Sequence, residues 1–450
     1  MTLRVRLGLL VVIPAVGLGG QAAAQDTHFW TEQYGNRARM LGGAMIGSAS
    51  DLSAVYYNPG RLALATEAEV LLAGNVVEYS ASKLGNETGD RALASTRFSV
   101  SPSLLAGELR FGWLGKSRLA FSFLTRNFSE FNTEARLATA SPGIAGRPDI
   151  DFLSVALRVD QKLSEYWGGV TWAVPLTETI GFGVSTFVAV RNQRGLVQRT
   201  TQAVLGGAPA VDVATGEYKF DHWRALWKLG VGTKLNQWDV GLTVTTPGLK
   251  LVGSGRVATD RSRVGVPGES GQLAFVDQRD ISSTYKSPWS VGIGGSRRLD
   301  RTNVHLGIEW FDGVALYDVL PGEPVQPVTG GAASDPTIRY EGGSVVNVAA
   351  GVAHTFSDKW QGYASLRTDF SAAVDNTAGN LAFTRWDLYH VAVGATLHGA
   401  STEFTTGAVF AFGSSEAPVN LANESLESSY FRVTVVLGFS FGFADTPTSQ

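Results

Sequence analysis

The residues that most often perform catalysis or hold metal ions are few in this chain, and their spacing does not suit either task. There are six histidines and no cysteine. No pair of histidines has the H-E-x-x-H spacing with which a helix presents two zinc ligands. His305 and Glu309 share one face of a predicted strand, but extended chain separates them by about 13 Å. We therefore expect no metal site, no cofactor and no enzyme. A Ser-His-acid set assembled from separate strands is the alternative that spacing leaves open.

The abundant glycines do not form phosphate-binding loops. The chain has 53 glycines, yet no glycine-rich stretch opens a helix directly after a strand, as a phosphate loop must. The glycines alternate with apolar residues instead, as in the stretch 180–184, and this places them on one face of a strand. A formal net charge of -3 gives no basic footprint for nucleic acid. These observations exclude the nucleotide-binding and nucleic-acid-binding classes.

The carboxy-terminal stretch 428–443 is the clearest predicted strand. The residues between its large apolar positions include Arg432, Thr434, Gly438 and Ser440. The apolar positions themselves recur at every second residue: Phe431, Val433, Val435, Leu437, Phe439, Phe441 and Phe443. Such a row of large apolar residues opposite small and polar ones suits a strand with lipid outside and a polar lumen inside.

The same alternation predicts fourteen strands along the chain. They fall at 67–82, 96–114, 117–137, 150–175, 180–201, 217–235, 238–256, 272–298, 302–316, 338–355, 360–374, 383–398, 403–413 and 428–443. Tight turns alternate with longer connections, predicted at 83–95, 138–149, 202–216, 257–271, 317–337, 375–382 and 414–427. Long loops at one end and short turns at the other are typical of outer-membrane barrels. The predicted fold is all-β, a fourteen-stranded antiparallel transmembrane β-barrel, with a soluble β-protein as the alternative.

The amino terminus predicts export. Arg4 and Arg6 precede the apolar run 7–18, and the small residues 22–24 provide a cleavage site after Ala24. We therefore divide the chain into a signal peptide at 1–24, an amino-terminal segment at 25–66, a barrel at 67–443 and a tail at 444–450. The expected location is the outer membrane of a Gram-negative-type bacterium. The absence of cysteine excludes both disulfides and a lipid-anchored amino terminus.

The segment 25–66 is too long for a simple leader and predicts short helices. Ser50 or Asp51 can cap a helix through residues 52–56. Asn58 and Pro59 then end it, because proline cannot continue the helical hydrogen bonding and disfavours helix at the preceding residue.

This segment resembles the amino-terminal hatch of the long-chain fatty acid transporter family, the FadL/TodX type. The residues that carry the resemblance are Gly42-Gly43-Ala44, Gly47-Ser48-Ala49, Asp51, Ser53-Ala54 and Tyr56-Tyr57-Asn58-Pro59. The family pattern continues Asn-Pro-Ala-Gly-Leu, whereas this chain has Gly60-Arg61 in place of Ala-Gly. The resemblance implies a monomeric barrel whose lumenal hatch of short helices plugs it. It also implies that Asp51, Tyr57, Asn58 and Pro59 set the shape of the hatch.

The resemblance further implies that a hydrophobic ligand enters from outside, binds an apolar pocket and leaves laterally near a kinked third strand. The third strand shows a matching irregularity. Leu119, Phe121 and Phe123 face outward, but beyond them the phase inverts, since Asn127 takes the outward parity and Phe128 the inward one. A slip of one residue reverses every side chain, so we expect a bulge between Thr125 and Phe128. A strand that has simply risen above the membrane would give the same pattern.

Strand parity places two groups of candidate ligand-binding residues in the lumen. The charged residues are Arg126, Arg191, Lys228, Glu309, Arg367, Asp369 and Arg432. They form either a network that braces the wall or, for one or two of the basic ones, a seat for a carboxylate headgroup. The aromatic residues are Phe128, Phe187, Phe311 and Tyr363. They line an apolar pocket or pack against the hatch.

The sequence therefore predicts a channel for the passive uptake of fatty acids, other lipids or aromatic hydrocarbons. The alternative is a general diffusion porin or a structural barrel without hydrophobic transport. The expected partners are the hydrophobic ligand and the lipid and lipopolysaccharide of the outer membrane.

Overall fold

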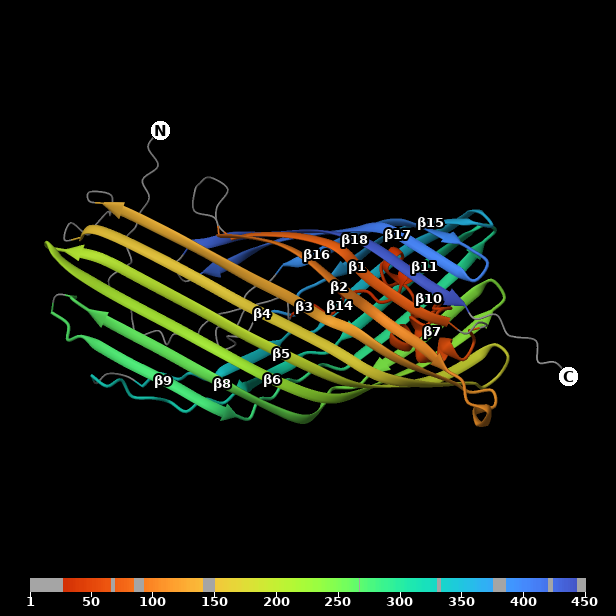
Figure 1. Cartoon of the computed structure of the whole chain (residues 1–450), viewed down its shortest axis with the longest axis horizontal. Coiled ribbons are helices and arrows are strands. Elements are labelled where there is room, and N and C mark those ends of the chain that lie inside the picture. Colours follow the sequence, from red (N-terminus) through yellow and green to blue (C-terminus); the bar gives the residue numbers. More distant parts are fainter. Residues whose placement is uncertain are drawn as a thin grey trace, which may run out of the picture.

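A computed structural model describes residues 27–65, 69–84, 93–140, 150–266, 268–329, 333–374, 386–419 and 424–442 (Figure 1). The predicted signal peptide and its cleavage site, Phe443 and the predicted tail lie outside these residues.

The described chain is almost entirely strand. Its short helices are α1 (Asn36–Met40), α2 (Ala54–Tyr57), α3 (Pro59–Leu62) and the 3-10 turn η1 (Gly112–Leu114). The first strands are β1 (Glu69–Leu84), β2 (Leu93–Leu109), β3 (Arg118–Ala140), β4 (Ile150–Pro175), β5 (Ile180–Leu205), β6 (Ala208–Leu235), β7 (Trp238–Thr245), β8 (Leu249–Val264) and β9 (Gln272–Ile281). The others are β10 (Ser290–Leu299), β11 (Thr302–Phe311), β12 (Val314–Leu320), β13 (Ile338–Gly342), β14 (Val345–Ser357), β15 (Trp360–Asp369), β16 (Asp387–His398), β17 (Thr402–Val419) and β18 (Glu424–Gly442).

These strands form a closed antiparallel barrel with fourteen staves. The main sheet has 16 segments, and it closes where β1 pairs with β18 and β5 pairs with β6. Segments β7 and β8 follow one another along β6 and make one stave, and β9 and β10 make another, which leaves fourteen. Strands β12 and β13 form a separate hairpin. The predicted fold class is confirmed.

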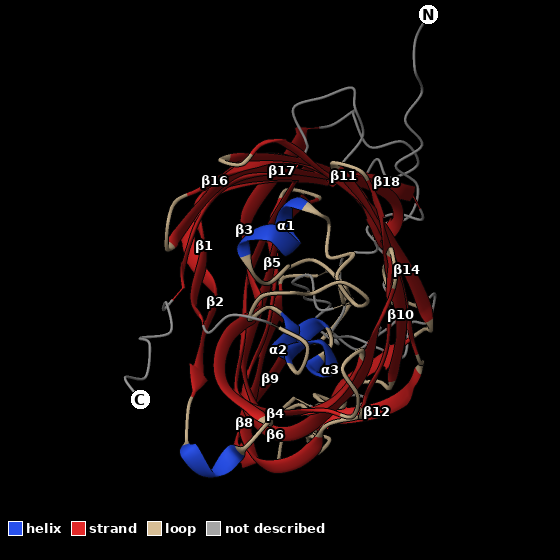
Figure 2. Ribbon diagram, turned by 90° about the vertical axis from the view of Figure 1, so that its right-hand side faces the viewer, coloured by secondary structure: helices blue, strands red, loops and turns tan. Residues whose placement is uncertain are grey.

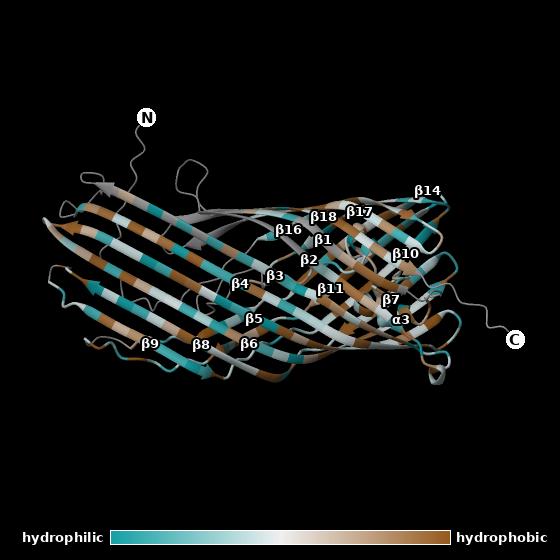
Figure 3. Cartoon of the chain, in the orientation of Figure 1, coloured by the Kyte–Doolittle hydropathy of each residue, from teal (hydrophilic) through white to brown (hydrophobic). Residues whose placement is uncertain are grey.

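The barrel has the alternation expected of a wall between lipid and lumen. Along β18, Phe431, Val435 and Phe439 are each at least 40% exposed, whereas Arg432 and Ser440 are buried in the interior. Figure 3 shows the corresponding bands of brown and paler residues along the strands. Outward apolar side chains are stable next to acyl chains, and this outward band distinguishes the barrel from a soluble sheet. None of the helices in the described part of the chain has the length and apolar character required to cross a bilayer.

The wall is much taller on one side than on the other. Strands β4, β5 and β6 have 26, 26 and 28 residues, whereas β10, β11 and β15 have 10 each. Ten residues of strand span about 33 Å, enough to cross a bilayer when tilted, so the longer strands project well beyond it. The predicted loop at 202–216 is wrong, because β5 and β6 continue through it and turn at Gly206 and Gly207. Both glycines have positive φ, which a two-residue hairpin turn requires.

At the opposite end the staves are joined by short turns, as the sequence predicts. Residues 176–179, 236–237, 300–301, 358–359 and 399–401 make five of these connections. The connection between β2 and β3 is longer than predicted, because it includes η1.

The predicted irregularity of the third strand is a β-bulge. The β3–β4 register shifts between Thr125 and Asn127, so Arg126 is the extra residue. The bulge turns both Arg126 and Asn127 toward the lumen. It also reverses the parity that follows, so Phe128 lies on the outer face, with the Lys162 ammonium 5.9 Å from its ring centre. The predicted lumenal position of Phe128 is therefore wrong. One extra residue in the strand is the cause.

Residues 27–65, which we call the hatch, lie inside the barrel near the end with the short turns (Figures 1 and 2). Viewed along the barrel, α1, α2 and α3 sit within the ring of strands. Most hatch residues are fully buried, including Tyr34, Met40 and Leu41. The largest apolar cluster joins the hatch to inward side chains of the wall. The hatch is thus the core of the barrel at this end.

Candidate functional site

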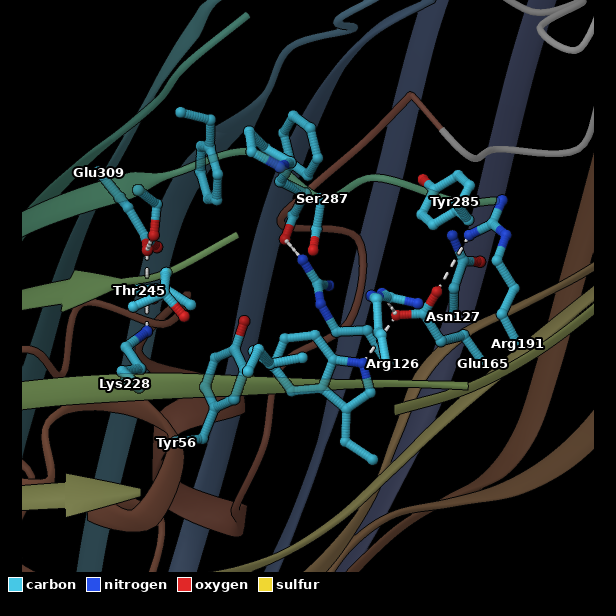
Figure 4. Close-up of a pocket in the computed structure, with 18 of the residues that line it drawn as sticks. Tyr56, Arg126, Asn127, Glu165, Arg191, Lys228, Thr245, Tyr285, Ser287 and Glu309 are labelled. Carbon is cyan, nitrogen blue, oxygen red and sulfur yellow. Dashed lines mark hydrogen bonds and ion pairs between the residues drawn. The ribbon is translucent and has the colours of Figure 1, made fainter. Parts of the chain in front are cut away.

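A cavity of about 60 Å³ lies in the lumen directly above the hatch (Figure 4). The hatch contributes His28, Phe29 and Tyr56. The wall contributes Arg126, Asn127, Glu165, Trp167, Arg191, Arg224, Leu226, Lys228, Thr245, Thr246, Tyr285, Ser287, Pro288, Ser290, Glu309 and Phe311. The lining combines aromatic surface with several charged side chains, so it can contact both an apolar group and a charged group of a ligand.

The β3 bulge places Arg126 in this cavity. Arg126 donates a hydrogen bond from Nη2 to the carbonyl of Phe29 at 2.7 Å, and its guanidinium lies 5.5 Å from the centre of the Trp167 ring. Thr125 bonds instead to the carbonyl of Pro102 across the β2–β3 boundary. The bulge thus connects the wall to the hatch at the point where the pocket forms.

Glu165 is the centre of the pocket's main charge cluster. Its two carboxylate oxygens accept hydrogen bonds from Arg191 Nη1 at 3.0 Å and from Arg224 Nη2 at 2.6 Å. Trp167 Nε1 donates to the same carboxylate at 2.7 Å. The Arg191 guanidinium also lies 3.8 Å from the centre of the Tyr285 ring. Two cations therefore share one buried carboxylate, and the cluster carries a local excess of positive charge.

A second pair lies at the opposite end of the pocket, as Figure 4 shows. Lys228 Nζ is 3.7 Å from Glu309 Oε1, and its ammonium lies 4.6 Å from the centre of the Tyr56 ring. Glu309 also accepts hydrogen bonds from Trp30 Nε1 at 2.8 Å and from Ser290 Oγ at 2.7 Å. Burial raises the pKa of Tyr56 to about 12, so this phenol stays neutral beside the ammonium.

The pocket as a whole carries more cations than carboxylates. Four basic side chains line it (Arg126, Arg191, Arg224 and Lys228) against the two carboxylates Glu165 and Glu309, which leaves a formal excess of two positive charges. Arg224 is 1% exposed, and its Nε and Nη1 have no hydrogen-bond partner. Buried donors are almost always paired in native proteins, so these two atoms indicate a place for an acceptor.

The other predicted arginines hold the hatch and lie away from the pocket lining. Arg432 on β18 binds Glu32 at 2.9 Å and the carbonyl of Thr31 at 3.0 Å. Arg367 on β15 donates to the same carbonyl at 3.0 Å, and Asp369 accepts from the Thr31 hydroxyl at 2.7 Å. We call this group, together with Arg39, Glu78 and Trp30, the latch. Its geometry is that of the predicted bracing network.

The predicted aromatic residues divide in a similar way. Phe311 lines the pocket and stacks on Phe29 of the hatch with 4.5 Å between ring centres. Phe187 is fully buried under Trp167, beside the pocket but outside its lining. Tyr363 lies deeper, in the core between wall and hatch, and donates its hydroxyl proton to Gln361. The structure thus brings five of the candidates together in the pocket lining: Arg126, Arg191, Lys228, Glu309 and Phe311.

The predicted hatch residues take part in its internal structure. Asp51 accepts hydrogen bonds from the backbone and hydroxyl of Ser53 ahead of α2. Tyr57 donates to Gln33 at 2.6 Å and accepts from the backbone nitrogen of Tyr34 at 3.0 Å. Burial raises the pKa of Tyr57 well above its usual value, so its hydroxyl keeps the proton that it donates.

Asn58 ties the hatch to the wall. Its Nδ2 donates to the carbonyls of Ile46 at 2.7 Å and Val231 at 2.9 Å, and its Oδ1 accepts from the Gly60 nitrogen at 3.0 Å. Pro59 occupies the first turn of α3, where its missing N–H costs nothing. A Cβ on Gly230 of β6 would overlap Asn58 Oδ1. Glycines on the lumenal face of the wall therefore allow the hatch to pack closely against the strands.

Arg61, where the sequence departs from the hatch pattern, has a defined role. Its Nη1 binds Asp239 at 3.0 Å, and its Nε donates to the carbonyl of Ala49 at 3.3 Å. The replacement of Ala-Gly by Gly60-Arg61 thus adds a bond between α3 and the start of β7.

Sequence reasoning missed four of the principal pocket residues: Glu165, Trp167, Arg224 and Tyr285. Arg224 has the same parity as Lys228 on one predicted strand, and Glu165 and Trp167 share a parity on another, so the alternation contained a signal for these three. Tyr285 lies in a break between β9 and β10, where no periodicity applies. Among the described residues no cluster of three or more His, Asp or Glu side chains is arranged to hold a metal ion.

Comparison with solved structures identifies the fold. The toluene transporter TodX of Pseudomonas putida is 14% identical, with a TM-score of 0.63, over 92% of this chain and 100% of that one. A FadL homologue of Pseudomonas aeruginosa is 12% identical, with a TM-score of 0.59, over 93% and 100% of the two chains. The toluene transporter TbuX of Ralstonia pickettii is 12% identical, with a TM-score of 0.53, over 92% and 99%. The barrel shares its fold with these transporters.

These likenesses lie in the structure and not in the sequence. No protein-family model matches the chain, and no curated sequence matches it. The alignments with the first two structures span the full length of the solved chains.

Proposed function

We propose that this protein is an outer-membrane channel for the passive uptake of hydrophobic molecules, and that its ligand is an amphiphile with an acidic headgroup, such as a long-chain fatty acid. The observation that carries the proposal is the pocket above the hatch, where aromatic surface meets two excess positive charges. Arg224 Nε and Nη1 are the donors that a ligand carboxylate would satisfy. A toluene-like hydrocarbon has no group that could pair with them.

In this proposal the gradient of ligand drives its movement. The ligand reaches the pocket from the side of the long strands, is held there, and leaves through the wall between β2 and β3. Among the described residues the ladder between these strands ends at Leu104 and Leu124, directly below the bulge. The cavity of about 60 Å³ is smaller than the roughly 150 Å³ cavity that accommodates benzene. Binding therefore requires movement of lining residues. Because Phe29 and Tyr56 belong to the hatch, we propose that part of the hatch moves when the ligand binds.

The outward apolar band supports placement in the outer membrane as a monomer, surrounded by lipid and lipopolysaccharide. Export with cleavage after Ala24 is part of the proposal. Mass spectrometry of protein purified from outer membranes tests it, since the mature chain should begin at Gln25. A different amino terminus would contradict the assigned cleavage site.

Equilibrium binding and flux measurements on the purified protein test the ligand class. We expect oleate to bind more tightly than oleyl alcohol, which has the same chain without the charge, and toluene to bind weakest. In proteoliposomes we expect oleate flux without flux of a small sugar. Sugar flux without oleate flux would support the diffusion porin instead. Binding of oleyl alcohol as tight as that of oleate would contradict the acidic headgroup.

A further inference from the structure

The wall is interrupted a second time, between two staves that also contribute to the pocket lining. The ladder between the stave β7–β8 and the stave β9–β10 stops at Thr245 and Ser290 and resumes at Gly255 and Ile281. The two segments between, 246–254 and 282–289, are both described, and no β-ladder joins them. We call this break the seam.

Proline is the local cause of the break. Pro247 lies between β7 and β8, and Pro288 lies between β9 and β10. Proline has no N–H to donate to a neighbouring strand, so it is confined to edges and irregular positions of sheets. The β2–β3 boundary has the same feature, since Pro102 lies directly above the last ladder pair of those strands.

Isolated hydrogen bonds, most of which involve side chains, close the seam where the backbone ladder is missing. The Gly248 nitrogen donates to Ser287 Oγ at 3.0 Å, and Lys250 Nζ donates to Ser282 Oγ at 2.8 Å. The Ser283 nitrogen donates to the carbonyl of Gly253 at 3.2 Å. A few isolated bonds are easier to open and re-form than a continuous ladder of backbone bonds.

Residues of the seam lie both in the pocket lining and on the exposed surface. On the inside, Thr246, Tyr285 and Ser287 line the cavity. On the outside, Leu251 is 53% exposed and Trp289 is 46% exposed. Non-helical backbone at membrane depth is tolerated only where it is buried in protein or lines a cavity, and the seam fits the second case.

We propose that the seam is a second lateral portal, through which the apolar chain of a ligand passes between the pocket and the bilayer. This inference rests on the proposed function. Tyr285 is its inner shutter, because its ring separates the seam from the guanidiniums of Arg191 and Arg224, at 3.8 and 5.1 Å from the ring centre. The headgroup remains with these arginines while the chain moves through the seam.

Cross-links test the proposal, and the absence of native cysteine makes each introduced pair unambiguous. The pair Lys250→Cys and Ser282→Cys locks the seam, because these two exposed residues are joined across it at 2.8 Å and neither lines the pocket. The pair Pro102→Cys and Thr125→Cys locks the β2–β3 boundary, where Thr125 Oγ1 lies 2.7 Å from the Pro102 carbonyl oxygen. The pair Ile293→Cys and Ile308→Cys lies on the outer face of the intact β10–β11 ladder and serves as the control. Where a disulfide does not form, dibromobimane cross-links the two thiols instead, and its fluorescence reports that both have reacted.

The measurement is the rate at which cis-parinaric acid leaves the pocket for a nanodisc bilayer that contains brominated lipid, which quenches it. We expect protein locked at β2–β3 to keep releasing the fatty acid to the bilayer. Adding the seam lock should slow that release at least tenfold. Where the lock is a disulfide, reduction should restore the rate. The control lock should change nothing. Two results would overturn the portal: exchange already lost with the β2–β3 lock alone, or exchange insensitive to the seam lock. Failure of the unmodified protein to bind the fatty acid would instead contradict the proposed function.

Discussion

The latch and the pocket are both buried clusters of arginine and carboxylate, yet their charge balance differs. The latch sets three arginines (Arg39, Arg367 and Arg432) against three carboxylates (Glu32, Glu78 and Asp369), and its arginines also donate to hatch carbonyls. The pocket sets four cations against two carboxylates, and Arg224 keeps two unpartnered donors. A balanced cluster holds two parts of a protein together, whereas a surplus of cations leaves capacity for an anionic ligand.

Breaking the latch should have the largest effect on stability. The substitution Arg432→Met removes the cation that Glu32 and Glu78 share and that also holds the Thr31 carbonyl. Glu32 keeps Arg39, so we expect a cost near the lower end of the range of about 3–5 kcal/mol for a broken buried pair. Unfolding in urea should show the loss, and planar-bilayer conductance should rise because the hatch loses the bonds from Arg432 to Glu32 and Thr31. The control is Arg136→Met, which removes an exposed pair with Glu134 and should cost about 0–1 kcal/mol. Equal stability of the two variants would refute the latch.

Removing the surplus charge of the pocket should change binding and leave the fold intact. In the Arg224→Met variant, Glu165 keeps Arg191 and Trp167 as partners, so we expect the free energy of unfolding to change by less than about 1 kcal/mol. Oleate affinity should fall about tenfold to a hundredfold, because a charge-assisted hydrogen bond contributes about 1.5–3 kcal/mol. Isothermal titration measures the affinity of the variant for oleate and for oleyl alcohol. An equal loss for the uncharged alcohol would show that Arg224 contributes packing only.

Crowding the far end of the hatch tests whether its position depends on the wall glycines. The substitution Gly230→Val brings side-chain atoms into the space of Asn58 and Pro59, and overpacking of this kind costs about 1–3 kcal/mol. We expect the hatch to become accessible to protease from the side of the short turns, while the latch end stays bound. Gly112→Ala, at a glycine with open space around it, is the matched control. A protected hatch in Gly230→Val would show that the turn accommodates a side chain there.

The smallest expected effect is on the pH dependence of the latch. Burial alone would raise the pKa of Glu32, but Arg432, Arg39 and Arg367 hold it below its usual value of 4.5. A carboxylate with a lowered pKa stabilises the fold above its unfolded value, and that stabilisation is lost as the pH falls through the lower folded value. Protection of the hatch from protease should therefore be constant from pH 7 to about 5 and decline only under more acidic conditions. A decline already at pH 6 would assign the transition to another group. In Glu32→Gln the acid decline should be weaker.

Part of this architecture could be predicted because it depends on local regularity. Alternation along Phe431–Phe441 identifies a lipid-facing strand, and Asn58-Pro59 identifies a turn, since both signals lie within a few residues. The reversed phase after Thr125 similarly reveals the bulge at Arg126. The error at Phe128 followed from continuing the parity through that bulge. The error at 202–216 arose because Gly206 and Gly207 indicate a turn but not how far the strands continue on either side.

The amino-acid sequence by itself determined much of the wall: which residues of the regular strands face lipid, where five of the short turns fall, and that a compact segment precedes them. These features follow from period-two patterning and proline geometry, which act over short distances along the chain. Only the tertiary structure decided which charges meet. Arg191 and Arg432 look alike in sequence, but the β4–β5 register places Arg191 opposite Glu165 in the pocket, and the seating of the hatch places Arg432 beside Glu32 in the latch. Their partners lie on other elements, so the register between strands and the seating of the hatch assign their roles.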